Sequence, residues 1–379
     1  MVAQERYLSW QEGGGLFNNV RLALQSAALL AVGLNRTLVW PPRAPDSEWT
    51  RKTHHDYLRD IPEPELLEDF YDMDRFRRGP VRSISYASFV TRVGLVGHGY
   101  RYKNIHHLNE TLVLERPRGS ETPAQLVLCV PRCPSTNCGS CVKEDLDRWD
   151  QCRLGYKINA EDTELMRTVH IKGWHYYFVG YFQDTTLQHD VKSAVSGSLR
   201  YRPEIYERAG RLIQALGGRR QYSCIHLRLQ ANFLDDHGLD THELHRWVVN
   251  TAKNTLMANE VLYVASDQWG LCTQEGNAAT LGVRGKLTEQ FFSSLTSVYN
   301  ATCFYHYRSQ LLHDTSDAWI PLIEQLACSE ARVYFSATPA SSFSEYIEEL
   351  RDQMDDDIRH TDEQQSRKQQ RGIPCYSLG

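Results

Sequence analysis

Near its start the chain has a strand–turn–helix–strand unit, which restricts the fold more than any other feature. Residues 7–10 are predicted to form a short strand, residues 18–32 a helix and residues 37–40 a second strand, with a glycine turn after the first. The helix is apolar on most faces, and its one polar face carries Arg21 and Gln25, which lie one turn apart. A helix of this kind packs on a sheet inside an α/β layer.

The glycine turn matches a dinucleotide-binding fingerprint only in part. Gly13 and Gly15 occupy the first two places of G-x-G-x-x-G, but Asn18 stands at the third. The second strand ends in Trp40 and two prolines, where the fingerprint requires an acidic residue to hold a ribose. The turn therefore predicts a close approach of the backbone to a different ligand, with a simple tight turn as the alternative.

Strands and helices alternate again in the second half of the chain. The predicted strands cover residues 222–228, 261–266 and 332–336, and the predicted helices cover residues 205–216, 242–256, 319–327 and 344–354. Such alternation indicates a parallel sheet. A second Rossmann-like domain is therefore expected to begin near residue 200.

These patterns predict two domains and a tail. Residues 1–200 form a Rossmann-like domain with irregular inserts at 41–80 and 115–155, the second of them rich in cysteine. Residues 201–351 form the second Rossmann-like domain, and residues 352–379 a charged tail. A short helix is expected within the first insert, in LLEDFYDMDRFRRGP.

The composition limits the class of partner. The 379 residues carry a net charge of −5 and contain no long basic block, which argues against nucleic acid as the main ligand. No apolar run approaches the roughly 18 residues that a membrane span requires. We therefore expect no nucleic-acid partner and no membrane span in this chain.

The cysteines and glycosylation sequons indicate an oxidising compartment. Asn35, Asn109 and Asn300 each begin an N-x-T sequon, which favours the lumen of the endoplasmic reticulum or Golgi. The start, MVAQERYLSW, is not a signal peptide, so a signal or anchor segment is not present in this sequence. Half of the ten cysteines crowd into the second insert and, without a paired histidine motif, favour disulfides over a zinc site. These five are Cys129, Cys133, Cys138, Cys141 and Cys152.

Polar side chains stand at the carboxyl ends of the predicted strands of the second domain, where open parallel sheets bind ligands. His226 and Arg228 follow the first strand, and Asp267 follows the second. Arg228 is suited to a bidentate grip on phosphate, and Asp267 to accepting hydrogen bonds from a guanine edge or a ribose. Each of these residues alone is also an ordinary structural feature.

The third strand leads into a serine-rich helix start. Ser342 and Glu345 are predicted to form a capping box, with Ser342 as the N-cap and Glu345 at N3. The N–H groups and dipole of such a helix start hold an anion. Together with Arg228, the turn suits a diphosphate-linked nucleotide bound without a metal, whereas a capping box by itself is often only a cap.

Four blocks, in this order, resemble those of the GDP-fucose protein O-fucosyltransferase superfamily. They are the glycine–asparagine turn with LNRTLVWPP, then DFYDMDRF, then LRYRPEIYERAGRLI with IHLR, and last LYVASD with SSFS, over roughly residues 7–350. The resemblance implies an α/β fold of the GT-B type, with two Rossmann-like domains and a cleft between them. It also implies an inverting transferase that needs no metal and no cofactor besides its donor substrate, GDP-fucose.

The resemblance assigns roles to single residues. Arg228 matches the arginine that contacts the donor phosphates and supports the leaving group, and His226 is its neighbour in the motif. Asp267 resembles the acid near the nucleoside, and Asn18 resembles the asparagine near the transferred sugar. The remaining donor-binding residues are Gly14 and Gly15 in the glycine turn and Ser341, Ser342 and Phe343 at the pyrophosphate.

Two positions depart from the family pattern. The motif His-x-Arg-x-x-x-Asp, part of the donor site, has Asn232 in its last place, so Asp235 or Asp236 takes over that role or the role is lost. Glu12 lies near the glycine turn, where some members place a glutamate base, but out of register, which leaves the base open. The predicted catalytic residues are Arg228, Asn18 and Glu12.

The resemblance implies transfer of fucose to a Ser or Thr hydroxyl of a protein acceptor. Two alternatives stay open. One is a related GT-B glycosyltransferase that acts on a polysaccharide or uses another nucleotide sugar. The other is a catalytically inactive binding protein of the same fold, for which the departure at Asn232 is the best support.

Overall fold

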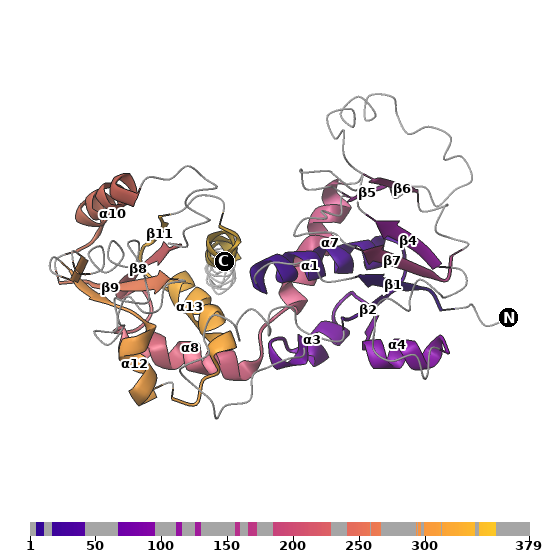
Figure 1. Ribbon diagram of the computed structural model, residues 1–379, viewed down its shortest axis with the longest axis horizontal. Coiled ribbons are helices and arrows are strands. Elements are labelled where there is room, and N and C mark those ends of the chain that lie inside the picture. Colours follow the sequence, from indigo (N-terminus) through magenta and orange to yellow (C-terminus); the bar gives the residue numbers. More distant parts are fainter. Residues whose placement is uncertain are drawn as a thin grey trace, which may run out of the picture. The chain divides into compact units, whose positions relative to one another are not determined.

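The chain divides into two compact units, Met1–Pro203 and Glu204–Gly379. Figure 1 shows the α/β architecture of each. The structure is a computed structural model, and it describes residues 5–10, 17–41, 67–94, 111–115, 126–129, 156–159, 166–172, 185–228, 241–257, 259–266, 293, 295–296, 299–311, 313–337 and 341–353.

The first unit is built on a parallel sheet in the order β3-β2-β1-β7-β4. Strands are added on both sides of β1, as in a doubly wound sheet. The bounds are β1 Tyr7–Trp10, β2 Thr37–Val39, β3 Ser83–Ile84, β4 Thr111–Glu115 and β7 Thr168–Lys172. A separate parallel pair joins β5 (Leu126–Cys129) to β6 (Tyr156–Asn159).

The helices of the first unit include the one predicted after the glycine turn. That helix, α1 (Phe17–Gly33), lies between β1 and β2 in the chain, so the predicted strand–helix–strand unit is present. Its polar residues Arg21 and Gln25 are buried, and Gln25 Nε2 donates to Ser196 Oγ of α7. The remaining helices are η1 Leu67–Asp69 and α3 Met73–Arg78, within the expected insert helix, and α4 Tyr86–Arg92 and α7 Thr185–Ser198.

A buried arginine ties the amino ends of the central strands together. Arg36, just before β2, donates to the carbonyl oxygens of Tyr7 and Arg167 at 3.2 Å each and of Met166 at 2.8 Å. Burial, and then the charge of Arg6, lower the pKa of Arg36 to about 10. Arg36 therefore stays charged at neutral pH, and its two terminal nitrogens donate to carbonyl groups at the edge of the sheet opposite the strand carboxyl ends.

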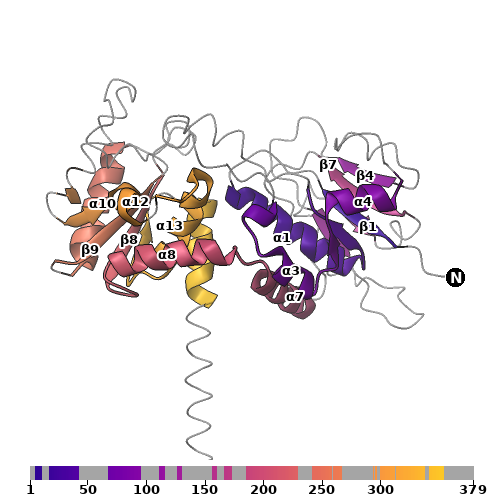
Figure 2. The ribbon, with the colours of Figure 1, turned by 90° about the horizontal axis from the view of Figure 1, so that it is seen from below.

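The second unit is built on a parallel sheet in the order β10-β9-β8-β11. The strands are β8 Tyr222–Leu227, β9 Val261–Ser266, β10 Asn300–Thr302 and β11 Tyr334–Ser336. The helices are α8 Pro203–Ala215, α10 Thr241–Thr255, α12 Phe304–Leu311, η4 Asp317–Trp319 and α13 Ile320–Ser329, followed by a helix over residues 342–353. Figure 2 shows α8 from the side.

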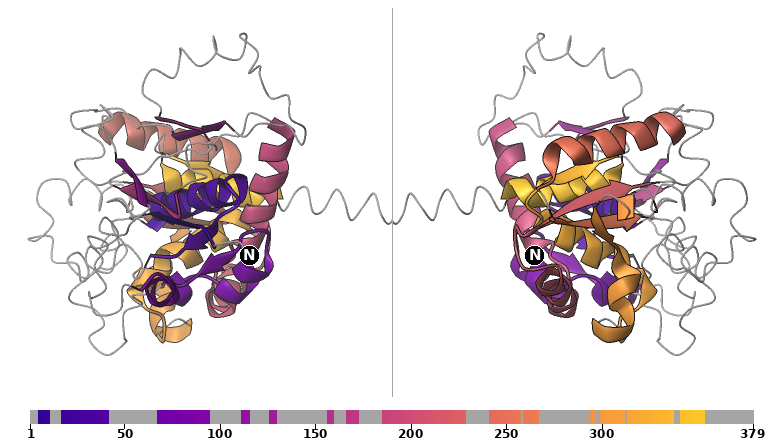
Figure 3. Two further views of the ribbon diagram at one scale, coloured as in Figure 1. Left: turned by 90° about the vertical axis from the view of Figure 1, so that its right-hand side faces the viewer. Right: turned by 90° about the vertical axis from the view of Figure 1, so that its left-hand side faces the viewer.

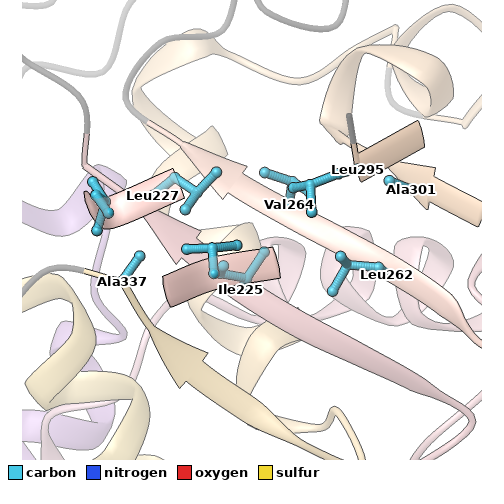
Figure 4. Close-up of a cluster of buried hydrophobic side chains, with 9 residues drawn as sticks. Ile225, Leu227, Leu262, Val264, Leu295, Ala301 and Ala337 are labelled. Atoms are coloured by element: carbon cyan, nitrogen blue, oxygen red, sulfur yellow. The ribbon is translucent and has the colours of Figure 1, made fainter. Parts of the chain in front are cut away.

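Alternating side chains of β8 and β9 pack on opposite faces of this sheet. One face packs on α10, and its cluster includes Ile225, Leu227, Leu262 and Val264 of the strands with Leu244 and Val248 of α10 (Figure 4). On the other face, Tyr222 and Tyr263 reach α13, where their hydroxyls donate to Ala327 O at 2.5 Å and Glu324 Oε1 at 3.0 Å. The right-hand view of Figure 3 shows α10, in red-orange, along one side of the strands of this sheet.

A disulfide joins the second face of the sheet to α13. Cys224 of β8 is bonded to Cys328 of α13, and both residues are fully buried. Cys303 is disulfide-bonded as well. The expected bridges of the cysteine-rich insert stay a prediction, because Cys133, Cys138, Cys141 and Cys152 lie outside the described residues and Cys129 is described only as the end of β5.

Glu260 is the hub of an ionic network at the amino end of β9. Its carboxylate accepts hydrogen bonds from Ser223 Oγ and Arg332 Nε, each at 2.8 Å, and from the Met257 N–H at 2.9 Å. Burial alone would raise the pKa of Glu260, but these hydrogen bonds and the charge of Arg332 hold it below its ordinary value. The amino edge of the sheet is thus closed by side chains that satisfy one another.

None of the helices within the described ranges is long and apolar enough to cross a membrane.

Candidate functional site

The carboxyl ends of β8, β9 and β11 lie together at one edge of the parallel sheet of the second unit. The half-buried Arg228 follows β8, and β11 ends at Ser336 and leads to the helix over residues 342–353. Asp267, predicted at the end of β9, lies outside the described residues. This edge is where an open parallel sheet binds its ligand.

His226 is the buried centre of this edge. Its Nδ1 atom lies 2.8 Å from Ser344 Oγ, which in turn lies 2.7 Å from Ser336 Oγ. Ser336 is paired with His226 across β11 and β8, and the N–H of Ala337 donates to His226 O at 3.0 Å. Side chains from two strands and one helix therefore meet at the Ser344 hydroxyl.

Phe343 makes two further contacts that fix the start of this helix. Its ring stacks on the imidazole of His226, with 4.4 Å between centroids and 26° between planes. The Phe343 carbonyl oxygen accepts from Gln325 Nε2 of α13 at 3.4 Å. The first turn of this helix is thus fixed to β8 and to α13, the helix that carries Cys328 of the disulfide.

The environment of His226 keeps its imidazole neutral. Burial, and then the positive charge of Arg228, lower the pKa of His226 to about 3, against an ordinary value of 6.5. At neutral pH the ring therefore carries no charge, and it acts only as a neutral donor and acceptor of hydrogen bonds.

The helix begins one residue earlier than the predicted capping box. The N–H of Glu345 donates to Ser341 O at 3.0 Å, which makes Ser341 the N-cap and Ser342 the first helical residue. The assignment of Ser342 as N-cap and Glu345 as N3 is therefore wrong. Ser344 occupies N3, and its hydroxyl turns to His226 and Ser336 instead of closing a box.

Ser341 has an unsatisfied hydroxyl at this helix start. The residue is 1% exposed, and nothing in the described part of the chain hydrogen-bonds to its Oγ. Leaving a buried polar group without a partner costs about 1–3 kcal/mol. The first N–H groups of a helix also lack carbonyl partners within the helix. A bound anion would satisfy the hydroxyl and these N–H groups together.

Arg228 supplies a permanent positive charge at the same edge. Its charge reaches His226, because it contributes to the lowered pKa of that residue. A guanidinium group binds phosphate oxygens in a bidentate manner. Among the described residues, no group of three His, Cys, Asp or Glu side chains is placed to hold a metal ion.

The structure brings part of the predicted site together. His226, Arg228 and the turn at Ser341, Ser342 and Phe343 share the strand-end edge of the second unit. In the first unit, Asn18 is buried in the first turn of α1. The other predicted site residues lie outside the described part of the chain: Glu12, Gly14, Gly15, Asn232 and Asp267.

Sequence reasoning missed three residues that fix this edge. Ser336 and Gln325 belong to no motif, and Ser344 stands in the SSFS block without a role of its own. The strand alternation offered one signal, because parallel pairing of the two strand ends places Ser336 opposite His226. The position of Gln325 depends on how α13 packs, which the sequence pattern does not specify.

A two-domain α/β protein with polar side chains and a helix start gathered at its strand ends is the class that this fold and edge define. The chain belongs to the GDP-fucose protein O-fucosyltransferase family, whose model matches residues 7–354. This confirms the resemblance drawn from the four sequence blocks.

Two solved structures of fucosyltransferases are similar to this chain. A crystal structure of POFUT1 in complex with GDP is 13% identical, covers 93% of this chain and 96% of its own, and gives a TM-score of 0.50. The fucosyltransferase NodZ from Bradyrhizobium is 15% identical, with 91% and 92% covered and a TM-score of 0.45. No curated protein matches the sequence. The predicted α/β class, of the GT-B type with two parallel-sheet domains, is confirmed.

Proposed function

We propose that the protein is an inverting, metal-independent fucosyltransferase that moves fucose from GDP-fucose to a Ser or Thr hydroxyl of a protein acceptor. The observation that carries this proposal is the buried, unpartnered Ser341 hydroxyl at a helix start, on the same sheet edge as Arg228. Membership of the family supports GDP-fucose as the donor.

The diphosphate of the donor would lie against the start of the helix over residues 342–353. The Ser341 hydroxyl and the N–H groups of the first turn would donate to its oxygens, and Arg228 would bind it from the end of β8. The nucleoside would extend toward the end of β9, where Asp267 follows in the sequence.

The proposed reaction is a direct displacement at the anomeric carbon of fucose. The acceptor hydroxyl oxygen forms a bond to this carbon, and the bond from the carbon to the β-phosphate oxygen breaks. The electron pair of the broken bond stays on GDP, and the hydroxyl proton passes to a base. Arg228 and the helix start would stabilise the negative charge that develops on GDP, the role that a metal ion plays in other transferases.

The acceptor side is assigned to the first unit. The resemblance of the glycine turn supports a role for Asn18 near the transferred sugar, and Asn18 stands in the first turn of α1 with its side chain buried. Glu12 is the nearest carboxylate in the sequence to that turn and is proposed as a candidate base.

We further propose that the protein works in the lumen of the secretory pathway. The buried Cys224–Cys328 disulfide supports an oxidising compartment. Two of the three sequon asparagines, Asn35 and Asn300, have exposed side chains, as glycosylation requires, and Asn109 lies outside the described residues. Full activity of protein folded in a reducing cytosol, with both cysteines as free thiols, would contradict this location.

A transfer assay tests the proposed reaction. GDP release from GDP-fucose should depend on the acceptor, for which a panel of folded disulfide-rich domains is the first choice, and should continue in excess EDTA. The linked fucose should have the anomeric configuration opposite to that of the donor. Activity that is lost in EDTA and restored by manganese would contradict metal independence. Transfer only to polysaccharides, or only from another sugar donor, would favour the alternative of a related GT-B glycosyltransferase. Binding of GDP-fucose without transfer would favour the alternative of a catalytically inactive binding protein.

A further inference from the structure

The Ser344 hydroxyl is the only described group that hydrogen-bonds to the His226 imidazole. The Nδ1 atom lies 2.8 Å from Ser344 Oγ, whereas Nε2 has no hydrogen-bond partner within the described residues. The ring is 4% exposed and lies under Phe343. Its orientation is therefore set by one hydrogen bond and one stacking contact, both with the start of the helix over residues 342–353.

The hydroxyl groups beside the ring allow a proton on either ring nitrogen, and the Tyr334 phenol also lies beside the Ser344 and Ser336 hydroxyls. Ser344 Oγ has one proton to donate, and it contacts both Nδ1 of His226 and Ser336 Oγ. In one arrangement Ser336 donates to Ser344, and Ser344 donates to an unprotonated Nδ1. The ring proton then sits on Nε2. An anion bound at this edge would favour this arrangement, because a protonated Nε2 would present a donor and not a lone pair to negative charge.

We propose that His226 is a positioning residue: its unprotonated Nδ1 accepts from Ser344 and so fixes the helix start that binds the donor diphosphate. This inference rests on the proposed donor site and names how that site is held in place. His226 acts on the donor site through Ser344, by the hydrogen bond between His226 Nδ1 and Ser344 Oγ.

The charges around the ring support a neutral imidazole. Arg228 follows on the same strand, and its guanidinium opposes protonation of the ring. On the neighbouring strand, burial raises the pKa of Tyr334, so that its phenol is neutral. The Glu324 carboxylate of α13 accepts from Tyr263, and Glu345 of the helix points to solvent. None of these contacts pairs a carboxylate with the imidazole.

The first test is the protonation state in the wild-type protein. With ¹⁵N-histidine labelling, and the His226 signals assigned by their loss in His226→Asn, Nδ1 should show the shift of an unprotonated nitrogen and Nε2 that of a protonated one. Both should stay unchanged between about pH 5 and 8, where an ordinary histidine titrates. In Ser344→Ala, the hydrogen bond is lost and these shifts should change. A proton found on Nδ1 would overturn the inference.

The second test compares two amide substitutions by calorimetric titration with GDP. Asparagine places its amide oxygen near the position of Nδ1, whereas glutamine reaches the position of Nε2. His226→Asn should therefore keep the GDP Kd within about threefold of wild type. His226→Gln and His226→Ala should weaken GDP binding by about tenfold to a hundredfold, as a displaced binding group does. Ser344→Ala should weaken it similarly, and adding it to His226→Ala should cost little more, since both remove one bond.

The control is a matched pair elsewhere in the second unit. His306 Nδ1 also lies 2.8 Å from a hydroxyl, Thr302 Oγ1, and His306→Ala should leave the GDP Kd unchanged. Binding retained by His226→Gln but lost in His226→Asn would assign the effect to a direct contact at Nε2 and refute the positioning role. If wild-type protein does not bind GDP, the proposed donor site is wrong. The ¹⁵N chemical shifts of the His226 ring would then still show whether Nδ1 accepts a hydrogen bond from Ser344.

Discussion

Replacing Arg228 with alanine is expected to lower the turnover of GDP-fucose by about a hundredfold to a thousandfold, as when a preorganised group that stabilises developing charge is removed. The reason is its place at the end of β8, on the same edge as the helix start with the unsatisfied Ser341 hydroxyl. The loss should remain at saturating donor, because the guanidinium is proposed to act on the charge that forms as GDP leaves. Steady-state kinetics with GDP-fucose measure both effects.

Two further arginine variants make this result specific. Arg228→Lys keeps the charge but loses the bidentate geometry, so its activity should lie between those of wild type and Arg228→Ala. Arg211→Ala removes an arginine from α8 that pairs with the exposed Glu207, and its activity should equal that of wild type. Near-full activity of Arg228→Ala at saturating GDP-fucose would show that this residue does not support the leaving group.

Replacing Cys224 and Cys328 with alanine is expected to lower the free energy of unfolding of the second unit by about 4–5 kcal/mol. The disulfide closes a loop with a sequence separation of 104, and in the chain-entropy model a loop of about 100 residues gives a stabilisation of about 4.7 kcal/mol. For a unit of this size, the loss corresponds to a melting temperature lower by roughly 10 °C. Calorimetric melting of the double variant measures it.

Reduced wild-type protein is the matched control for this variant. It keeps both sulfur atoms in the buried contact between β8 and α13 and loses this bond together with the other disulfides, including that of Cys303, so the double variant is also melted in reduced form to measure the contribution of the other bridges. A similar loss in both samples would assign the effect to the cross-link, and a larger loss in the alanine variant would add the removed packing volume. A double variant that melts within a degree or so of wild type would contradict a stabilising role for the disulfide.

The sequence predicted the fold class because its hydrophobic patterns are local. The unit β1–α1–β2 could be predicted from the glycine turn and the apolar helix, and β8, β9 and β11 from β-rich runs before helices. Six strands were not predicted, because each is short, with two to five residues, and owes its place to a neighbour in a sheet: β3, β4, β5, β6, β7 and β10. Strand pairing of this kind is a tertiary property that no local pattern encodes.

The sequence predicted which residues belong to the part of the candidate site that the structure describes, but not the hydrogen bonds and packing contacts between them. His226 and Arg228 were predicted at a strand end because a parallel sheet gathers its carboxyl ends at one edge. The cap was misplaced by one residue, because S-x-x-E is a local motif, whereas His226 and Ser336 draw the Ser344 hydroxyl to the sheet. The pairing of Cys224 with Cys328 could not be predicted either, since ten cysteines allow many connectivities.

The central claim is that the strand-end edge of the second unit binds the diphosphate of a guanine nucleotide, and nucleotide-dependent melting tests it most directly. A ligand that binds only the folded state stabilises it by about 2.7 kcal/mol at a hundred times its Kd, which for a chain of this length raises the melting temperature by a few degrees. GDP should give this shift and UDP and CMP a smaller one, because guanine presents adjacent N–H donors to a carboxylate such as Asp267 and uracil does not. A shift by UDP as large as that by GDP would contradict the assignment of a GDP-fucose donor site.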